Sequence, residues 1–255
     1  NPGAGLFEMS LNSEIYVDKS RLIEQTNRRI KTQQRFICVS RPRRFGKSMA
    51  LHMLAAYYGR SENTADLFGG LSVGKTESYK NHLNRYDVIR INLQEFVNAA
   101  KGIDAMLKML NDYLIFDLLE TYHDIRFRDE KNLIQVMKDI YIKTNRSFII
   151  LIDEWDCLFR EYQQDKGVQK QYLDFLRAWL KDQEYVALAY MTGILPIKKY
   201  GSHSALNMFT EYSMTDPGNL AEFFGFTEEE VKKLCTEYGM NFEEAEAWYN
   251  GYQLL

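Results

Sequence analysis

Cysteine is scarce in this chain. Among its 255 residues only Cys38, Cys157 and Cys235 carry thiols, and they are widely separated. An odd number of scattered cysteines indicates reduced thiols in a cytosolic setting and excludes a disulfide framework. The sequence also has no C-x-x-C pair and no grouping of histidine with cysteine, so it gives no indication of a zinc site.

Long apolar runs are absent as well. None approaches the roughly 20 residues that a membrane-spanning helix needs. The first residues, NPGAGLFEMS, lack the basic and then apolar arrangement of a secretory signal peptide. We therefore expect a cytoplasmic protein with no membrane partner.

Proline, glycine and net charge are also low. Four prolines and fifteen glycines are too few for long linkers or disorder, and 45% hydrophobic with 26% charged residues is typical of a globular domain. The net charge of −3 excludes a general basic field of the kind that drives non-specific nucleic-acid binding. A local basic patch over residues 41–47 is compatible with these totals.

The region 36–58 carries the clearest functional pattern. FICVS has the composition of a buried strand, RPRRFG follows as a basic loop, and apolar residues at helical spacing begin at Met49, directly after Gly-Lys-Ser. A strand, a loop and a helix N-terminus in this order form a phosphate-binding loop, because the free N–H groups and the positive end of the helix dipole face an anion. A chance Gly-Lys-Ser in a basic loop is the alternative, which the flanking strand and helix disfavour.

The loop departs from the usual G-x-x-x-x-G-K-[ST] pattern at its first position, where Arg41 replaces glycine. We predict that Lys47 reaches the β- and γ-phosphates of ATP and that the Ser48 hydroxyl holds Mg²⁺. The other nucleotide-binding positions in this prediction are loop residues: Arg41, Pro42, Arg43, Arg44, Phe45 and Gly46. The arginines among them add positive charge that a phosphate can use.

Residues 69–76, GGLSVGKT, match the consensus more closely than the first loop does. Their flanks disagree with it, because SENTADLF before them is polar rather than strand-like and ESYKNHLNRYD after them has no continuous apolar face. A phosphate loop needs a strand end as its anchor and a helix N-terminus for its N–H groups. We therefore interpret residues 69–76 as a surface connection.

A second decisive pattern lies at residues 147–154, SFIILIDE. Its apolar run indicates a strand that is covered on both faces, as in parallel sheets. Asp153 and Glu154 then fall at the carboxyl end, where ligands bind in open α/β sheets. This is the Walker B pattern: we predict that Asp153 holds Mg²⁺ through its water shell and that Glu154 is the catalytic residue that polarises the attacking water. A buried strand followed by a helix cap at Asp153 or Asp156 is the alternative.

The remaining periodicity completes an α/β domain, after a first segment, 1–20, that has few apolar residues and is expected to be mostly extended. We expect the other elements at these residues: strands at 87–93, 185–194 and 211–216, the last at an edge, and helices at about 20–31, 102–122, 130–144 and 168–182. Thr192 lies at the end of the strand 185–194 and is a candidate sensor of the γ-phosphate, with a turn-forming Thr-Gly pair as the alternative.

The last part of the chain is helical. Thr227 and Glu230 form a capping box ahead of a helix that Gly239 ends, and another helix starts near Asn241. No terminating signal follows, so we expect a fragment that was cut before a further C-terminal domain. We expect three parts: an extended and helical segment at 1–35 that packs on the core, an ATPase core at 36–218 and a helical lid region at 219–255.

These motifs together resemble the AAA-ATPase-like family of bacterial P-loop proteins. The matching segments span nearly the whole chain: YVDKS at 16–20, SRPRRFGKS at 40–48, LIDEWD at 151–156, MTGI at 191–194, FFGFTEEEV at 223–231 and WYNGY at 248–252. RPRRFGKS is specific, because the family itself carries arginine where the common motif has glycine. The resemblance implies a three-layer α/β P-loop NTPase fold of the AAA/STAND type, with about five parallel strands, and it implies ATP and Mg²⁺ as ligands. It gives Asp18, within YVDKS, no physical role.

Members of this family often carry a C-terminal nuclease-like domain of the PD-(D/E)xK class, which these 255 residues do not include. The resemblance therefore implies nucleic acid as a partner through such a domain. An arginine finger would come from this chain, with Arg160, Arg177 and Arg43 as candidates, or from a neighbouring subunit of a homo-oligomer.

The predicted function is Mg-dependent ATP hydrolysis that powers or gates a nucleic-acid-related activity. One alternative is an ATP-binding switch or interaction module with negligible turnover, and another is a small-molecule or polynucleotide kinase, for which the sequence shows no acceptor-site signature. Glu154→Gln separates the enzyme from the switch, because it should abolish turnover and preserve binding in the enzyme and change little in a switch.

Overall fold

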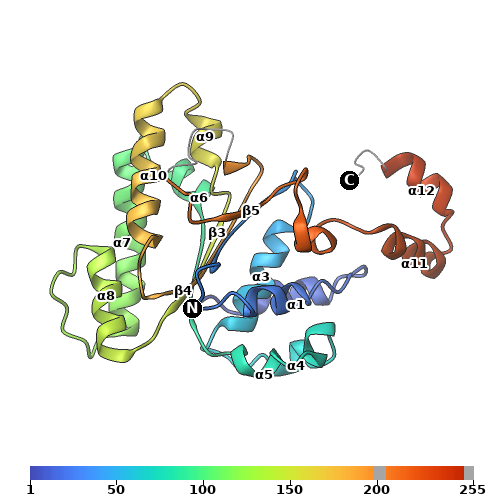
Figure 1. Ribbon diagram of the computed structural model, residues 1–255, viewed down its shortest axis with the longest axis horizontal. Helices are drawn as coiled ribbons and strands as arrows, with labels where there is room; N and C mark the ends of the chain where they lie inside the picture. Colours follow the sequence, from blue (N-terminus) through green and yellow to red (C-terminus); the bar gives the residue numbers. More distant parts are fainter. Residues whose placement is uncertain (198–204, 250–255) are drawn as a thin grey trace.

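The computed structural model describes residues 1–197 and 205–249. One sheet lies at its centre (Figure 1) and consists of β1 (Phe36–Ser40), β2 (Asp87–Asn92), β3 (Phe148–Asp153), β4 (Val186–Gly193) and β5 (Thr210–Tyr212). The strand order is β2-β3-β4-β1-β5, and every neighbouring pair is parallel. All carboxyl ends therefore meet at one edge, and β4 separates β1 from β3. The predicted five-stranded parallel α/β fold is confirmed.

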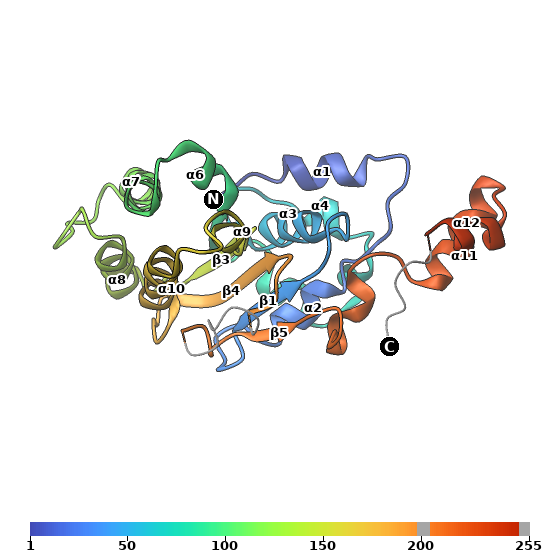
Figure 2. The same cartoon turned by 90° about the horizontal axis from the view of Figure 1, so that it is seen from above.

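Helices cover both faces of the sheet and make it the middle of three layers (Figure 2). The first face carries α1 (Gly5–Leu11), α2 (Leu22–Asn27), α3 (Lys47–Tyr58), α4 (Ala65–Phe68), the 3₁₀ helix η1 (Ser72–Lys75) and α5 (Tyr79–His82). The second face carries α6 (Leu93–Ala99), α7 (Ile103–Thr121), α8 (Leu133–Thr144), α9 (Cys157–Glu161) and α10 (Lys166–Leu180). Beyond the sheet lie the 3₁₀ helix η3 (Gly218–Phe223), α11 (Glu228–Tyr238) and α12 (Phe242–Tyr249).

Strand β3 shows why the sheet needs cover on both faces. All six of its residues are buried. Ile149 and Leu151 pack into the apolar cluster beneath α3, whereas Ile150 and Ile152 belong to the cluster on the opposite face. Each such side chain contributes about 1.5–3 kcal/mol by leaving water. The prediction of a strand covered on both faces is confirmed, and Asp153 is the one polar residue of β3.

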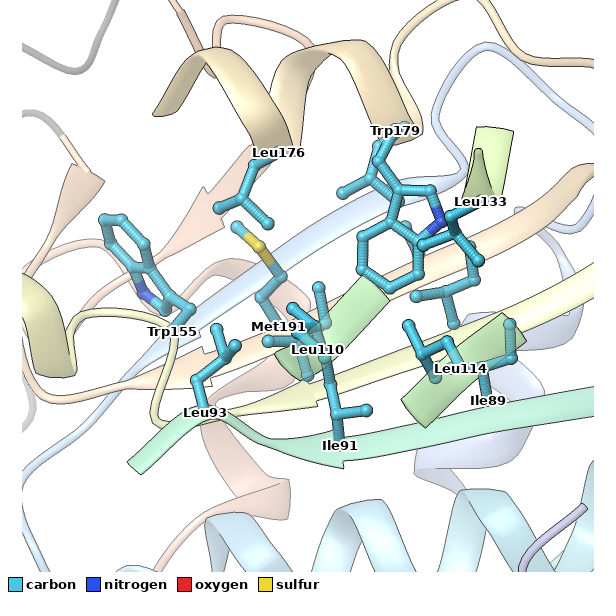
Figure 3. Close-up of a cluster of buried hydrophobic side chains, with 14 of the residues drawn as sticks. Ile89, Ile91, Leu93, Leu110, Leu114, Leu133, Trp155, Leu176, Trp179 and Met191 are labelled. Carbon is cyan, nitrogen blue, oxygen red and sulfur yellow. The ribbon is translucent and has the colours of Figure 1, made fainter. Parts of the chain in front are cut away.

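Trp155 fixes the chain where β3 ends. Its side chain is fully buried in the cluster shown in Figure 3, on the side of the sheet where Leu176 of α10 faces Met191 of β4. Its backbone N–H donates a 3.0 Å hydrogen bond to Thr192 O at the end of β4. Because this large anchor follows Asp153 and Glu154 directly, the two acids are held at the carboxyl edge of the sheet.

Two expectations about local structure were wrong. Residues 5–11 form α1 rather than an extended segment, because Phe7 is buried against the side chains around α3. Leu93 begins α6 instead of ending β2: the Asn92 side chain accepts a 3.1 Å hydrogen bond from Gln94 N and caps the helix. Apolar Leu93 fits either pattern, so the sequence alone could not locate this boundary.

Residues 69–76 form a connection between short helices, as expected. They follow α4, contain η1 and lead to α5, with no strand before them and no long helix after them in this described region. In the tail, Thr227 and Glu230 make the predicted capping box and Gly239 ends α11 with φ = 65°. Within the part of the chain that is described, every helix is too short or too polar to span a bilayer.

Candidate functional site

The loop of residues 41–46 connects β1 to α3. Gly46 precedes the helix with φ = 76° and ψ = 11°, in the left-handed region that residues with a Cβ rarely adopt. A Cβ added at Gly46 would meet no atom within 4 Å, so backbone conformation rather than crowding favours glycine here. The turn at Gly46 starts α3, whose first N–H groups have no acceptor within the helix and suit an anion.

Lys47 lies over this loop. It is only 6% exposed, and its ammonium donates a 2.8 Å hydrogen bond to Pro42 O. Burial lowers the pKa of Lys47, and the nearby carboxylates of Glu154 and Asp153 oppose that shift. The ammonium thus has a neutral carbonyl as its partner in a partly desolvated position, where a phosphate oxygen would bind it more strongly.

The carboxylate of Asp153 connects three segments of the chain. Ser48 Oγ donates a 2.6 Å hydrogen bond to Asp153 Oδ2. Asp153 Oδ1 accepts from the hydroxyl of fully buried Thr192, and also from Glu154 N at 3.0 Å. The structure therefore brings together Ser48, Asp153 and Thr192, which the sequence placed at one site from three separate motifs.

Glu154 follows β3 in a strained turn. Its φ is 55°, and this left-handed conformation costs a residue with a Cβ about 1–2 kcal/mol. Its carboxylate forms an ion pair with Arg160 in α9, and the Glu154 side chain is 24% exposed. Glu154 thus lies beside the Asp153 site, with its carboxylate already bound by a cation.

Asp156 has a structural role in the same turn. It is fully buried, and its Oδ2 accepts hydrogen bonds from Ile194 N at 3.2 Å and Leu195 N at 2.9 Å. It stands at the N-cap position of α9, but its side chain makes no capping hydrogen bond. The carboxylate instead binds the segment that follows β4, so it links the ends of β3 and β4.

The loop arginines have different surroundings. The side chain of Arg41 is buried and points away from the loop: its Nη1 donates to Tyr212 O at 2.7 Å, and its guanidinium lies 5.5 Å from the Phe224 ring centre. Its backbone N–H donates to Gly193 O at 3.1 Å. Arg43 and Arg44 are exposed. Arg41 therefore shapes the loop, and the charge available to a phosphate comes from Arg43, Arg44 and Lys47.

Residues 6–202 match the family described as Predicted AAA-ATPase. This match covers more than half of the chain. The chain belongs to this AAA-ATPase family. Membership and fold together support a P-loop ATPase domain, and the matched residues include the loop, Asp153, Glu154 and Thr192.

Two further proteins show similarity to this AAA-ATPase domain. An uncharacterized protein in the vnfD 5′ region of Azotobacter chroococcum mcd 1 is 27% identical over 251 residues, which cover 93% of this chain and 45% of the relative. The chain thus spans less than half of that protein's length. The crystal structure of a DNA replication initiation factor aligns with a TM-score of 0.41 and 11% identity, over 91% of this chain and 55% of the other.

The AAA-ATPase domain also has an apolar cavity of about 200 Å³ beside Gly46. Its lining comes from the N-terminal segment, α3, the end of η3 and the residues after it: Ile15, Tyr16, Val17, Met49, Met53, Phe223, Gly225 and Phe226 among others. Lys19, also in the lining, donates to Glu222 O at 2.5 Å and contacts both carboxylate oxygens of Glu230 at 2.6 Å. A largely apolar cavity of this kind suits a weakly polar group rather than a phosphate.

The residues present fit Mg²⁺ bound together with a nucleotide. The Ser48 hydroxyl and the Asp153 carboxylate are oxygen donors within 2.6 Å of each other. Among the described residues, no group of three or more His, Cys, Asp and Glu side chains could hold a metal by itself. This set suits Mg²⁺, which keeps several waters and binds one or two protein oxygens plus substrate phosphates.

Sequence reasoning missed part of this site. It named Arg160 among three candidate arginines without its contact to Glu154, and it gave Asp156 no role beyond a helix cap. It also assigned no role to Asp18, whose carboxylate accepts hydrogen bonds from Ser20 N at 2.9 Å and Ser72 N at 2.7 Å. The YVDKS motif singled out Asp18, but its partner at Ser72 depends on the tertiary fold.

Proposed function

We propose that this AAA-ATPase domain binds Mg-ATP over residues 41–48 and hydrolyses it. The hydrogen bond between Ser48 and Asp153 carries the proposal, because it places a helix N-terminus, a hydroxyl and a carboxylate at one point on the carboxyl edge of the sheet. In P-loop NTPases a hydroxyl and an acid in these positions hold Mg²⁺. Ser48 and Asp153 would hold it here, matching the Walker A and Walker B patterns, and the ion would neutralise charge on the phosphates.

The chain's own residues supply the other parts of the reaction. Lys47 would exchange Pro42 O for a phosphate oxygen, and the N–H groups from Arg43 to Ser48 would surround the β-phosphate. Glu154 would accept a proton from the water that attacks the γ-phosphorus. Thr192 would keep Asp153 in place from the neighbouring strand end. In this assignment Glu154 has the catalytic role, and Thr192 is the candidate sensor of the γ-phosphate in addition to its contact with Asp153.

The apolar cavity beside Gly46 would bind the adenine base. It lies at the loop end of α3, on the side of Met49 and Met53, and the segment 15–17 forms one wall. The end of η3 and the residues after it also line the cavity, so the described residues 219–249 would act as a lid over the core, with the N-terminal segment packed beside both. The pair Lys19–Glu230 supports this division, because it ties the N-terminal segment to α11.

An ATP-binding switch with negligible turnover is the second candidate. The ion pair between Glu154 and Arg160 favours it, because the guanidinium occupies the carboxylate that would have to contact the attacking water. The two candidates share the binding site and differ in turnover. Glu154→Gln separates them: in an ATPase it abolishes hydrolysis and preserves ATP binding, and in a switch it changes little.

Binding and hydrolysis of Mg-ATP by Lys47→Ala and Lys75→Ala test the proposal. Lys75 is the exposed lysine of the Gly-Lys-Thr sequence at 74–76 and serves as the matched control. We expect Lys47→Ala to weaken ATP binding by about 100-fold, or roughly 2.7 kcal/mol, and Lys75→Ala to leave it unchanged. Loss of binding in Lys75→Ala alone would refute the assignment to residues 41–48.

Hydrolysis would serve a nucleic-acid-related activity in the cytoplasm. This part of the proposal is supported by the resemblance to proteins that carry a nuclease-like domain, and the relative that matches over 45% of its own length has room for such a domain. ATPase rates of the full-length protein with and without DNA test it. An ATPase rate that DNA leaves unchanged would contradict the nucleic-acid-related activity but not ATP hydrolysis. An ATPase rate per molecule that rises with protein concentration would indicate a homo-oligomer.

A further inference from the structure

Arg160 occupies the position next to the proposed catalytic acid. It lies in α9, the short helix that begins at Cys157 directly after the turn of Glu154. Its Nη2 contacts the Glu154 carboxylate and lies 3.4 Å from Gln94 Oε1. Only 20% of the Arg160 side chain is exposed. The guanidinium is therefore held at the carboxyl edge of the sheet, in partly desolvated surroundings where its charge acts strongly.

The Arg160 guanidinium has an N–H donor that makes no hydrogen bond in the part of the chain that the structure describes. Its Nε is buried and forms an ion pair with Asp156 Oδ2 at 3.6 Å, which is too long for a hydrogen bond, and it makes no hydrogen bond within the described residues. Arginine has five N–H donors in a planar fork, which matches the oxygens of a phosphate group. An anion that arrived beside Glu154 could use the donors that the carboxylate leaves unbound.

Arg160 also lies close to the phosphate loop. Glu154, which Arg160 contacts, follows Asp153 directly, and Asp153 accepts a hydrogen bond from Ser48, the residue after Lys47. Two cations from separate parts of the chain, the Lys47 ammonium and the Arg160 guanidinium, thus flank the same acidic corner. A phosphate between them would relieve their mutual repulsion.

The other candidate arginines are placed differently. Arg177 is exposed in the last turn of α10, and β4 begins six residues after that helix ends, so Arg177 lies at the amino edge of the sheet. The eight residues of β4 put on the order of 25 Å between this edge and the site. Arg43 is an exposed residue of the phosphate loop itself, and it does not contact Glu154 in the described structure.

We propose that Arg160 is the arginine finger of this domain, supplied by the same chain, and that it binds a γ-phosphoryl oxygen as the phosphoryl group transfers. The inference rests on the proposed ATPase function. In that step the oxygen of water forms a bond to the γ-phosphorus and loses a proton to Glu154. The bond from the γ-phosphorus to the bridging oxygen breaks, and its electron pair leaves with ADP. Arg160 moves from Glu154 to the phosphoryl oxygens, which frees the carboxylate to take the proton.

Binding of ADP with aluminium fluoride tests the proposal, because this pair mimics the transferring phosphoryl group. Arg160→Gln keeps hydrogen-bonding capacity at a similar size, Arg160→Lys keeps the charge, and Arg177→Gln is the matched control. We expect aluminium fluoride to tighten ADP binding about 100-fold in the unmodified chain and in Arg177→Gln. In Arg160→Gln this gain should be lost while the dissociation constants of ADP and ATP change less than about threefold. Turnover should fall at least about 100-fold, and less in Arg160→Lys.

The possible outcomes separate the two proposals. The role of Arg160 is overturned if aluminium fluoride tightens ADP binding as much in Arg160→Gln as in the unmodified chain, or if Arg160→Gln turns over ATP faster. Neither result contradicts the proposed ATP binding. The proposal is also overturned if aluminium fluoride tightens ADP binding only at protein concentrations where the chain associates, because the arginine finger then comes from a neighbouring subunit. An unmodified chain that binds Mg-ATP without turnover overturns it as well. Absence of Mg-ATP binding overturns the proposed function together with this inference.

Discussion

Ser48 and Asp153 are 105 residues apart in the sequence, and a 2.6 Å hydrogen bond joins the hydroxyl of one to the carboxylate of the other. Ser48 lies in α3, which follows β1, and Asp153 ends β3, but β1 and β3 are not neighbours because β4 lies between them. The two side chains meet because α3 leaves the loop after β1 and packs across the sheet against β3. The crossing of α3 over β4 is therefore what assembles the predicted metal-binding corner.

Removal of the Ser48 hydroxyl should weaken the use of Mg²⁺. For Ser48→Ala we expect the Mg²⁺ concentration at half-maximal ATP binding to rise about tenfold, or roughly 1.4 kcal/mol, since one of two protein oxygens is lost. Calorimetric titration of Mg²⁺ at a fixed ATP concentration measures this half-maximal Mg²⁺ concentration. Thr76→Ala, at the matching position of the Gly-Lys-Thr sequence at 74–76, is the control, and equal Mg²⁺ requirements in both variants would exclude Ser48 from the metal site.

Thr192 allows a test between a sensor and a simple turn residue. Its buried hydroxyl donates to Asp153, so Thr192→Val keeps the shape and leaves a carboxylate oxygen with one donor fewer. We expect kcat to fall about tenfold in Thr192→Val, with the ATP dissociation constant within about twofold, and to recover in Thr192→Ser. Steady-state kinetics with equilibrium ATP binding measure both quantities. Unchanged kcat in Thr192→Val would favour the turn-forming interpretation.

The strands and the positions of the main candidate site residues were predictable because their signals are local. The apolar run before Asp153 and the strand, loop and helix around Lys47 each lie within a few residues, and the structure places β1 and β3 at the predicted residues within one position. The pairing of Ser48 with Asp153 followed from two such local patterns. Parallel strands bring their carboxyl ends to one edge, which supplied the remaining geometry.

The features that sequence reasoning missed depend on distant partners. Arg41 has the charge of a phosphate ligand, yet its acceptor is Tyr212 O in β5, 171 residues away. The N-terminal helix α1 forms where Phe7 finds a buried site, which no local periodicity reveals. The ion pair of Glu154 with Arg160 needs the left-handed turn at Glu154, and nothing in the neighbouring residue types requires that turn.

Asp18 should make stability depend on pH. Burial alone would raise the pKa of Asp18, but hydrogen bonds from Ser20 and Ser72 outweigh burial and hold the pKa below its ordinary value of 3.8. Because the pKa is lower in the folded chain, the carboxylate stabilises the protein above about pH 4, and this contribution is lost as the pH falls through the folded value. At pH 7 we expect Asp18→Asn to be about 1–2 kcal/mol less stable.

Urea unfolding at a series of pH values measures this effect. The stability difference between the unmodified chain and Asp18→Asn should shrink below about pH 4. Asp66→Asn is the matched control, because Asp66 is an exposed acid in α4. A difference that stays constant down to about pH 2 would contradict the role of the Asp18 carboxylate.

Lys19 and Glu230 should control how firmly the proposed lid holds the nucleotide. The Lys19 ammonium contacts both carboxylate oxygens of Glu230, which also accepts from Thr227 N at 2.8 Å at the start of α11. We expect Lys19→Ala to raise the ATP dissociation constant about threefold without changing kcat, and the double variant with Glu230→Gln to show coupling of about 0.5–1 kcal/mol. Lys232→Ala, which breaks an exposed pair within α11, should have no effect. Additive effects of the two substitutions on ATP binding would show that the contact does not hold the lid.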